Sequence, residues 1–335
     1  MFNMYKLLFM TSLMMGTLIS ISSYSWLGMW IGLEINLLSI IPLFSNSKNM
    51  MNNEATLKYF ITQVLASTIL LFSIIMMSMN FIEYWNNNLN LIFNSSLLTK
   101  MGAAPFHFWF PEVMEGLNWS NCLILLTWQK IAPMILIMYN KNMMMFFFLI
   151  IMFSMLISGI MGINQISMRK ILAYSSINHL GWMISSMLFM ESIWMIYFIT
   201  YAIISINMIL IFKMFNIFFM KQLFIILNKN YMLKMFFIMN FLSLGGLPPF
   251  LGFLPKWLTI QTLVENNLVF MSIFMVIMTL MTLYFYIRIT FSTLMINMNE
   301  LNYYIKNWFK NWTLMVFNFL SLTGLISITL IFNFY

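Results

Sequence analysis

The sequence predicts an all-α polytopic membrane protein, and three observations support this fold class. Of the 335 residues, 62% are hydrophobic and 7% are charged, and the mean hydropathy is +0.90, whereas soluble domains average about 25% charged residues. Apolar segments of about 20 residues, the length of a membrane-spanning helix, recur along the whole chain. Two of these segments share a glycine–proline pattern, which is typical of broken membrane helices in an internal repeat.

Apolar length and polar punctuation place the spans in order along the chain. About eleven are expected, at residues 5–22, 26–44, 55–79, 89–110, 119–139, 143–163, 168–189, 192–218, 233–264, 267–291 and 311–333. The fourth and the ninth carry the glycine–proline pattern, so the repeat unit is five helices with a broken fourth helix. An odd number of helices inverts the second copy. The expected domains are the first five-helix repeat at 1–140, the inverted second repeat at 141–292 and a C-terminal transmembrane helix at 293–335.

The two breaks are expected at proline-containing turns. The fourth span contains Gly102 and Pro105, and the ninth contains Gly246, Pro248 and Pro249. Proline has no backbone N–H and its ring clashes with the preceding helical turn, so it interrupts a helix. In lipid, such a break is tolerated only where protein or a watery cavity receives the freed backbone groups. Paired breaks in two halves of a chain therefore predict an ion-handling site.

Four charged side chains lie in or beside these spans, in chain order Glu34, Lys100, Lys130 and Lys256. A charge at the centre of a membrane helix costs about 2.5–3.5 kcal/mol, so four facing lipid would cost on the order of 10 kcal/mol. They are therefore expected to face a hydrated interior path, with Glu34 paired to a lysine. Burial disfavours the charged form of an amine and a nearby carboxylate favours it, so the cargo is expected to be a proton.

Three further side chains are candidate members of this proton relay, each with a simpler alternative. Lys58 lies near the start of the third span, where its ammonium could reach the lipid headgroups along the helix. His179 lies in the seventh span among serine and glycine residues, which suit either a hydrated path or a packed helix interface. His107 adjoins the first break, as a structural cap or a relay group.

The composition argues against bound redox cofactors and metals. Cys122 is the only cysteine, and His107 and His179 are the only histidines, which excludes a cysteine-ligated iron–sulfur cluster and bis-histidine sites for several haems. We therefore expect this chain to bind no cofactor and no metal ion. The 39 methionines and the lack of aspartate indicate an A/T-rich organellar gene, which predicts mitochondrial encoding.

The basic residues predict an orientation. Eleven of the sixteen lysines and arginines lie in connectors on the side of the N-terminus, and Lys141 alone lies on the opposite side. Connectors rich in lysine and arginine lie on the inner side of a membrane, which is the matrix side for a mitochondrial protein. The N-terminus is therefore expected in the mitochondrial matrix and the C-terminus toward the intermembrane space. The net charge of +8 thus requires no nucleic-acid partner.

Several strings within the spans match one known family. They are WLGMWIGLEIN at 26–36, EATLKYF at 54–60, GAAPFHFW at 102–109, TWQK at 127–130, LAYSSINH at 172–179 and GGLPPFLGFLPK at 245–256. They resemble the chain 2 family of mitochondrial NADH–ubiquinone oxidoreductase, one of the antiporter-like membrane subunits of respiratory complex I. The match covers nearly the whole chain and is specific in motif order.

The resemblance implies a relay in which Glu34 pairs with Lys100, Lys130 is the next group, and Lys256 exchanges protons toward the far side or a neighbouring subunit. It implies other complex I membrane-arm subunits, including further antiporter-like chains, and phospholipids such as cardiolipin as partners. NADH, FMN, iron–sulfur clusters and ubiquinone are then expected in partner subunits. Bacterial relatives begin three helices earlier, and the short animal form lacks these helices. Lipid or another subunit is therefore expected to cover the face of the first three spans that this leaves exposed.

The expected function is proton translocation through the buried Glu/Lys relay, coupled to NADH:ubiquinone electron transfer in the mitochondrial inner membrane. One alternative is a free-standing cation/proton antiporter with the same fold and charges. The scarcity of carboxylates in the spans argues against a sodium site, because hard cations need several oxygen ligands. A second alternative is a purely structural membrane-arm subunit, although a scaffold gains nothing from four intramembrane charges.

Overall fold

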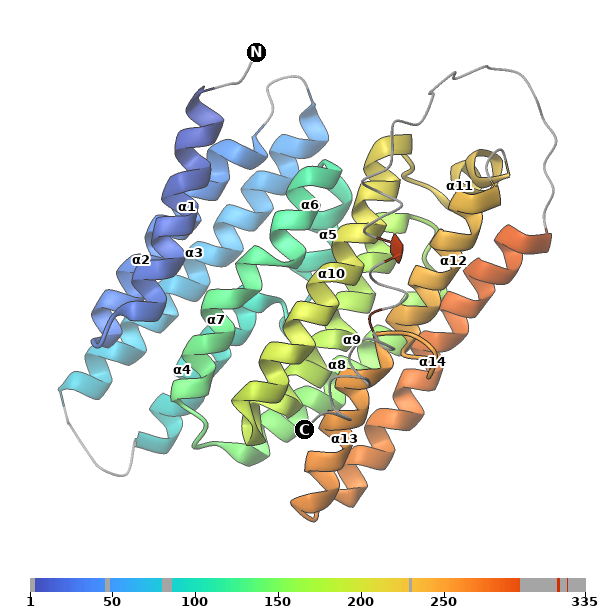
Figure 1. Ribbon diagram of the computed structural model, residues 1–335. Helices are drawn as coiled ribbons and strands as arrows, with labels where there is room; N and C mark the ends of the chain where they lie inside the picture. The colour runs from blue at the N-terminus through green and yellow to red at the C-terminus, as the bar shows by residue number, and fades with distance from the viewer. Residues whose placement is uncertain are drawn as a thin grey trace. The chain divides into compact units, whose positions relative to one another are not determined.

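The structure is a computed structural model that describes residues 4–45, 49–79, 86–228, 231–295, 318–319 and 324. Regular secondary structure in this part of the chain is helical, with one isolated antiparallel bridge between Ser167 and Phe219. The expected all-helical fold class is therefore confirmed. The chain forms two compact units, Met1–Ser154 and Met155–Tyr335, and their helices are labelled in Figure 1.

The helices follow one another with short connectors. The first unit contains α1 Met4–Ser22, α2 Trp26–Phe44, α3 Met50–Ser78, α4 Asn86–Met101, α5 Trp109–Gly116, α6 Trp119–Leu126, α7 Trp128–Tyr139 and the start of α8 Met144–Ile163. The second unit continues with α9 Met168–Phe189, α10 Glu191–Phe215, α11 Met220–Leu227, α12 Tyr231–Gly245, α13 Phe253–Glu265 and α14 Val269–Met295.

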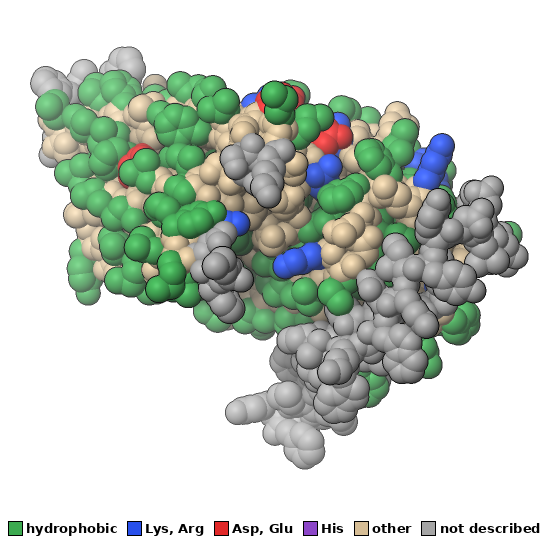
Figure 2. Space-filling model, turned by 90° about the horizontal axis from the view of Figure 1, so that it is seen from above, with side chains coloured by type: hydrophobic (Ala, Val, Ile, Leu, Met, Phe, Trp, Pro, Cys, Tyr) green, Lys and Arg blue, Asp and Glu red, His purple; other side chains and the backbone are tan. Residues whose placement is uncertain are grey.

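Seven segments of the described chain are long and apolar enough to cross a membrane. They are α1, α2, α3, the α6–α7 segment Trp119–Tyr139, α8, α10 and α14. Many large hydrophobic side chains of the described helices are exposed, as lipid contact requires. Figure 2 shows hydrophobic side chains across the face seen from above. The count of eleven stays a prediction, because most of the expected span at 311–333 lies outside the described residues.

Close packing of small residues joins the first two helices, which lie side by side in Figure 1. A Cβ atom on Gly32 of α2 would lie 2.5 Å from the backbone nitrogen of Ser20 on α1. Only glycine allows the two backbones to come so close. Lipid supplies no hydrophobic drive for helix association, so such contacts are a main source of attraction between membrane helices.

Helical geometry stops at both glycine–proline turns. Helix α4 ends at Met101 and α5 begins at Trp109, while α12 ends at Gly245 and α13 begins at Phe253. The two ends and the two starts are each 144 residues apart. The same local structure therefore occurs at the same register in both units.

Helices α4 and α12, which precede the two breaks, end in the same hydrogen-bonded motif. Gly102 and Gly246 follow the last helical residue with φ angles of 73° and 79°, which glycine adopts without steric cost. The next amide then turns back: Ala103 N–H donates to the Leu98 carbonyl at 3.1 Å, and Leu247 N–H donates to the Leu242 carbonyl at 3.3 Å. This is the bonding of a Schellman cap, which satisfies carbonyls at a helix end.

The structure differs from the sequence-based expectation in two elements. The fifth expected span, 119–139, is interrupted at Thr127, whose φ and ψ angles are −112° and −71°. One such residue does not change the apolar pattern, so hydropathy cannot reveal it. Helix α11 lies in a segment expected to be a connector. It forms because the Gln222 side chain accepts hydrogen bonds from the Phe218 and Phe219 amides at 2.8 and 3.3 Å.

Helix α9 forms the interior of the second unit. Every residue from Ile171 to Leu188 is buried, and α10, α13 and α14 pack against it. It is absent from the seven apolar spans of the described chain because its sequence contains many polar residues. Since α9 contacts protein on all sides, those polar residues are shielded from lipid.

Candidate functional site

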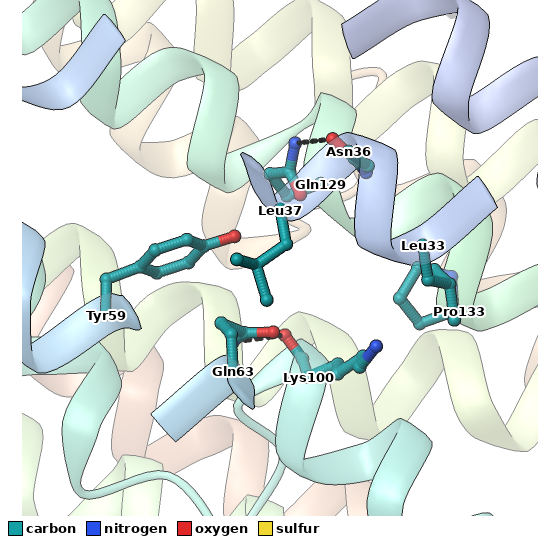
Figure 3. Close-up of a pocket in the computed structure, with 8 residues that line it drawn as sticks. All are labelled: Leu33, Asn36, Leu37, Tyr59, Gln63, Lys100, Gln129 and Pro133. Carbon is teal, nitrogen blue, oxygen red and sulfur yellow. Dashed lines mark hydrogen bonds between the residues drawn. The ribbon is translucent and has the colours of Figure 1, made fainter. Parts of the chain in front are cut away.

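A cavity in the first unit surrounds Lys100. Its lining comes from α2, α3, α4 and α7, and consists of Leu33, Asn36, Leu37, Tyr59, Gln63, Lys100, Gln129 and Pro133. The space for water is about 10 Å³, which is on the order of one water molecule. Figure 3 shows the Lys100 side chain extending away from Tyr59 and Gln63. The cavity thus brings a buried ammonium and several neutral polar groups together.

Two side-chain hydrogen bonds organise the cavity wall. Gln63 of α3 donates through Nε2 to the Lys100 backbone carbonyl at 3.4 Å, and so caps the last turn of α4. Gln129 of α7 donates through Nε2 to Asn36 Oδ1 of α2 at 2.9 Å. Both bonds are drawn in Figure 3. The amides therefore connect the helices that surround Lys100.

Glu34 lies on α2, three residues before Leu37 in the cavity wall. From the sequence, it is expected to pair with Lys100. Among the described residues, however, no ion pair joins the two, and Glu34 Oε1 is buried without a hydrogen-bond partner. A buried carboxylate oxygen needs a donor. One Glu34 oxygen thus lacks a donor among the described residues, and the pairing of Glu34 with Lys100 stays a prediction.

Lys130 lies on α7 and is 1% exposed. Its ammonium lies 5.6 Å from the ring centroid of Phe110 on α5, within the range of a cation–π interaction. The same ring packs against Gly102, where a Cβ atom would lie 3.0 Å from it. The helix before the first break, α4, thus carries Lys100, and the helix after it, α5, contacts Lys130.

Two other predicted residues lie around this break. Lys58 of α3 is 44% exposed and forms ion pairs of 3.0 Å with Glu54 on the same helix and of 3.0 Å with Glu112 on α5. This arrangement connects α3 to the helix that follows the break. His107 is buried, and its Nδ1 lies 3.3 Å from the Pro105 carbonyl oxygen. Pro105 itself follows a cis peptide bond.

In the second unit, Lys256 lies in the first turn of α13 and is 6% exposed. Its Nζ donates to the Gly245 carbonyl at 2.8 Å and to the Leu244 carbonyl at 3.5 Å. These carbonyls end α12, where the helix dipole places partial negative charge. The ammonium also lies 5.9 Å from the ring centroid of Trp182 on α9. The end of α12, before the second break, thus binds the ammonium of a lysine on α13, after the break.

His179 lies on α9, three residues before Trp182. Its Nδ1 lies 2.9 Å from the hydroxyl oxygen of Tyr197 on α10, and its ring centroid lies 5.1 Å from that of Tyr201. The neighbouring Asn178 donates to Thr282 Oγ1 of α14 at 3.1 Å. Lys256 therefore contacts the buried helix that carries His179, and polar side chains of this helix bond to α10 and α14.

Comparison with known proteins shows the family of this chain. The chain is 51% identical over 336 residues to NADH-ubiquinone oxidoreductase chain 2 of Anopheles gambiae, with 97% of both chains covered. It is 54% identical over 332 residues to the protein of that name from Aedes aegypti, again with 97% of both covered. The chain belongs to the NADH-ubiquinone oxidoreductase chain 2 family. The resemblance carried by the sequence motifs is thereby confirmed.

More distant matches agree with this family. The protein of the same name from Lemur catta is 37% identical over 331 residues, with 96% of this chain and 94% of the relative covered. The profile of the family described as "NADH:quinone oxidoreductase/Mrp antiporter, TM" matches residues 23–282. Both breaks, the Lys100 cavity and α9 lie within the matched residues.

Solved structures share the fold. A chain of respiratory complex I from Thermus thermophilus superposes with a TM-score of 0.85 at 21% identity, covering 96% of this chain and 78% of that one. A chain of the Mrp complex from Dietzia sp. DQ12-45-1b superposes with a TM-score of 0.72 at 16% identity, covering 83% and 58%. The chain 2 family thus has an antiporter-like membrane fold.

Sequence reasoning missed several polar side chains of this chain 2 family member. Asn36, Gln63 and Gln129 line the Lys100 cavity, and Tyr197 contacts His179. A usable signal existed, because an amide within an apolar span needs a hydrogen-bond partner. Asn36 follows Glu34 by two residues, and Gln129 directly precedes Lys130. Within the described residues, no group of three or more His, Cys, Asp or Glu side chains could hold a metal ion.

Proposed function

We propose that this chain is a proton-translocating core subunit of the membrane arm of respiratory complex I. Its lysines and Glu34 carry protons while partner subunits, which hold NADH, FMN, iron–sulfur clusters and ubiquinone, perform electron transfer. The observation that carries this proposal is the burial of three lysines beside helix breaks. Lys100, Lys130 and Lys256 are 7%, 1% and 6% exposed. Such charges are costly in a membrane protein and are typical of ion and proton pathways.

In the first unit, the proposed step moves a proton between lysines by way of the cavity. The Lys100 N–H bond breaks as a new O–H bond forms on a cavity water, and that proton passes to neutral Lys130. Glu34 favours the charged form of Lys100, whereas burial disfavours it. A small movement of Glu34 relative to Lys100 would therefore load or release a proton. His107 and Lys58 are adjacent to this path.

In the second unit, Lys256 is the proposed exchange group and His179 is a candidate neighbour in the relay. The Gly245 and Leu244 carbonyls favour the ammonium form of Lys256. Loss of the proton removes that attraction and leaves two carbonyls with weaker partners. Proton loss would thus loosen the contact between α12 and α13, which couples protonation to the shape of the broken helix.

The proposal extends to topology and surroundings. The 144-residue spacing of the breaks supports two inverted repeats of five helices. The N-terminus is proposed to lie in the matrix and the C-terminus toward the intermembrane space, in the mitochondrial inner membrane. Other membrane-arm subunits and phospholipids such as cardiolipin are the proposed partners.

A second candidate function is free-standing cation/proton antiport. The fold shared with a chain of the Mrp complex favours it. The high identity to proteins named NADH-ubiquinone oxidoreductase chain 2 favours the complex I role. Purification separates the two, since only a complex I subunit is recovered with NADH:ubiquinone reductase activity.

The substitution Lys130→Met tests the relay. We expect the complex to assemble and the proton-to-electron ratio of reconstituted vesicles to fall, because methionine fills similar space but carries no proton. Lys213→Met is the matched control, because Lys213 is exposed at the end of α10. A wild-type ratio in Lys130→Met would refute the relay role of this lysine.

A further inference from the structure

We propose that the hydrogen bond between Asn36 and Gln129 is a positioning contact that holds Lys130 against the helix of Glu34 and the Lys100 cavity. This inference rests on the proposed proton-translocating function and assigns it two further residues. Neither side chain carries a proton in the relay. Their effect acts through the placement of Lys130.

The bond lies in the wall of the cavity that Lys100 lines. Gln129 Nε2 donates to Asn36 Oδ1 at 2.9 Å, and both residues line the cavity that contains Lys100. Asn36 is 3% exposed. On α2 it lies two residues after Glu34, and on α7 Gln129 directly precedes Lys130. One side-chain bond therefore connects the carboxylate helix to the first turn of the lysine helix.

Lys130 lies in a turn whose backbone hydrogen bonding is irregular. Helix α7 starts at Trp128 after the interruption at Thr127, so Lys130 lies in a first turn whose amides lack regular intrahelical partners. Its N–H donates to the Thr127 carbonyl three residues earlier, at 3.3 Å, and not in the four-residue pattern of an α-helix. Pro133 lies inside α7 and has no N–H to donate to the Gln129 carbonyl four residues earlier. The bond between Asn36 and Gln129 therefore acts on a turn where Thr127 and Pro133 interrupt the regular backbone bonding.

A second amide separates positioning from simple attachment of the helices. Asn121 on α6 donates through Nδ2 to the Leu43 carbonyl of α2 at 3.2 Å. It also ties this span to α2, but it precedes the interruption at Thr127 and is not part of the cavity lining. The two halves of the span are thus fastened to α2 separately. Of these two bonds, the Gln129 bond acts on the half that carries Lys130.

Substitutions in the whole complex test this assignment. Asn36→Leu and Gln129→Leu remove the bond, Asn121→Leu is the matched control, and the exchanged pair Asn36→Gln with Gln129→Asn restores an amide contact of the same combined length. NADH oxidation and proton uptake are measured in reconstituted vesicles, with assembly checked by native gel. Misplacing reacting groups by about 1 Å can slow a step by up to about 100-fold. We therefore expect both leucine variants to lose about half or more of the pumping rate.

The exchanged pair distinguishes positioning from general stability. We expect it to recover most of the pumping rate, and Asn121→Leu to pump as the wild type does. Wild-type pumping in both cavity leucine variants would overturn the inference, as would equal losses in Asn121→Leu. Failure of the leucine variants and of the exchanged pair to assemble would also overturn it, because the bond would then be structural.

The Lys130→Met variant keeps this inference distinct from the proposed function. If Lys130→Met pumps normally, the relay itself is wrong and the positioning role ends with it. If Lys130→Met loses pumping while Gln129→Leu does not, the relay stands and only the positioning role of the amide pair is refuted.

Discussion

At the scale of single residues, burial decides which charges matter. Lys130 is 1% exposed beside an aromatic ring, whereas Lys58 is 44% exposed and has two carboxylate partners. Exposed ion pairs contribute little to stability, about 0–1 kcal/mol. A buried ammonium is retained at a much larger desolvation cost. The sequence places both lysines within spans, but only their surroundings separate an anchoring group from a candidate relay group.

The proposed pairing of Glu34 with Lys100 gives a prediction at this scale. Glu34→Gln removes the carboxylate that is proposed to favour the charged form of a nearby lysine, and Lys100→Met removes that lysine. We expect each to lower the pumping rate, and the double variant to be little worse than either, because residues that act as a unit are not additive. Proton uptake by vesicles containing the three variants measures this.

The control for these variants is Glu265→Gln, because Glu265 is exposed at the end of α13. Its carboxylate accepts a hydrogen bond at 3.0 Å from Gln261, one turn earlier on the same helix. It should pump normally. Losses that simply add in the double variant would show that Glu34 and Lys100 act independently.

At the scale of elements, the two breaks combine a common cap with different charges. Both helices end in a glycine of positive φ. At the first break, a neutral glutamine and the Trp109 indole donate to the Lys100 and Thr99 carbonyls at 3.4 and 3.0 Å. At the second break, the Lys256 ammonium donates to the Gly245 carbonyl at the end of α12. Removing a proton therefore changes the cap of α12 directly, while the cap of α4 has no titrating donor.

Gly246→Ala should disturb the second break in two ways. An L-residue at positive φ costs about 1–2 kcal/mol, and the new Cβ would lie 2.8 Å from Cδ and 2.9 Å from Nζ of Lys256. We expect lower thermal stability of the complex and reduced pumping.

The adjacent Gly245→Ala is the control for that substitution. Gly245 is the last residue of α12, and the nearest atom to a Cβ there is 3.7 Å away, an ordinary contact. It should leave the melting temperature and pumping unchanged. Equal effects of the two alanines would show that neither the backbone angle nor Lys256 is responsible.

At the scale of the whole molecule, charge distribution predicts orientation. The spans expected from the sequence place eleven of the sixteen lysines and arginines on the side of the N-terminus and Lys141 alone on the opposite side. The only cysteine, Cys122, is 0% exposed, so an introduced cysteine can be labelled selectively. Both Lys6 at the start of α1 and Lys141 between α7 and α8 are within the described residues.

Labelling of single cysteines tests that orientation. Lys6→Cys should react with an impermeant maleimide only in inverted inner-membrane vesicles, where the matrix face is outside. Lys141→Cys should react only in mitoplasts, where the opposite face is outside. The reversed pattern would show that the predicted orientation is wrong, and labelling of both on one side would remove one span from the count between them.

The order and type of the elements could be predicted from the sequence because hydropathy is a local property. Helices α2 and α9 begin and end at the residues expected, 26–44 and 168–189. The interruption at Thr127 and helix α11 could not be predicted in this way. The first depends on a single residue within an apolar run, and the second on one glutamine that caps two amides.

By itself, the sequence determined that this chain is an all-helical membrane protein of the chain 2 family, with duplicated glycine–proline turns and charges inside its spans. Only the tertiary structure decided which groups meet. Asn36 and Gln129 are 93 residues apart and hydrogen-bonded, and Lys256 contacts carbonyls 11 and 12 residues earlier. The physical reason is that hydropathy depends on neighbours in the chain, whereas a buried polar group must find its partner on another helix or across a break.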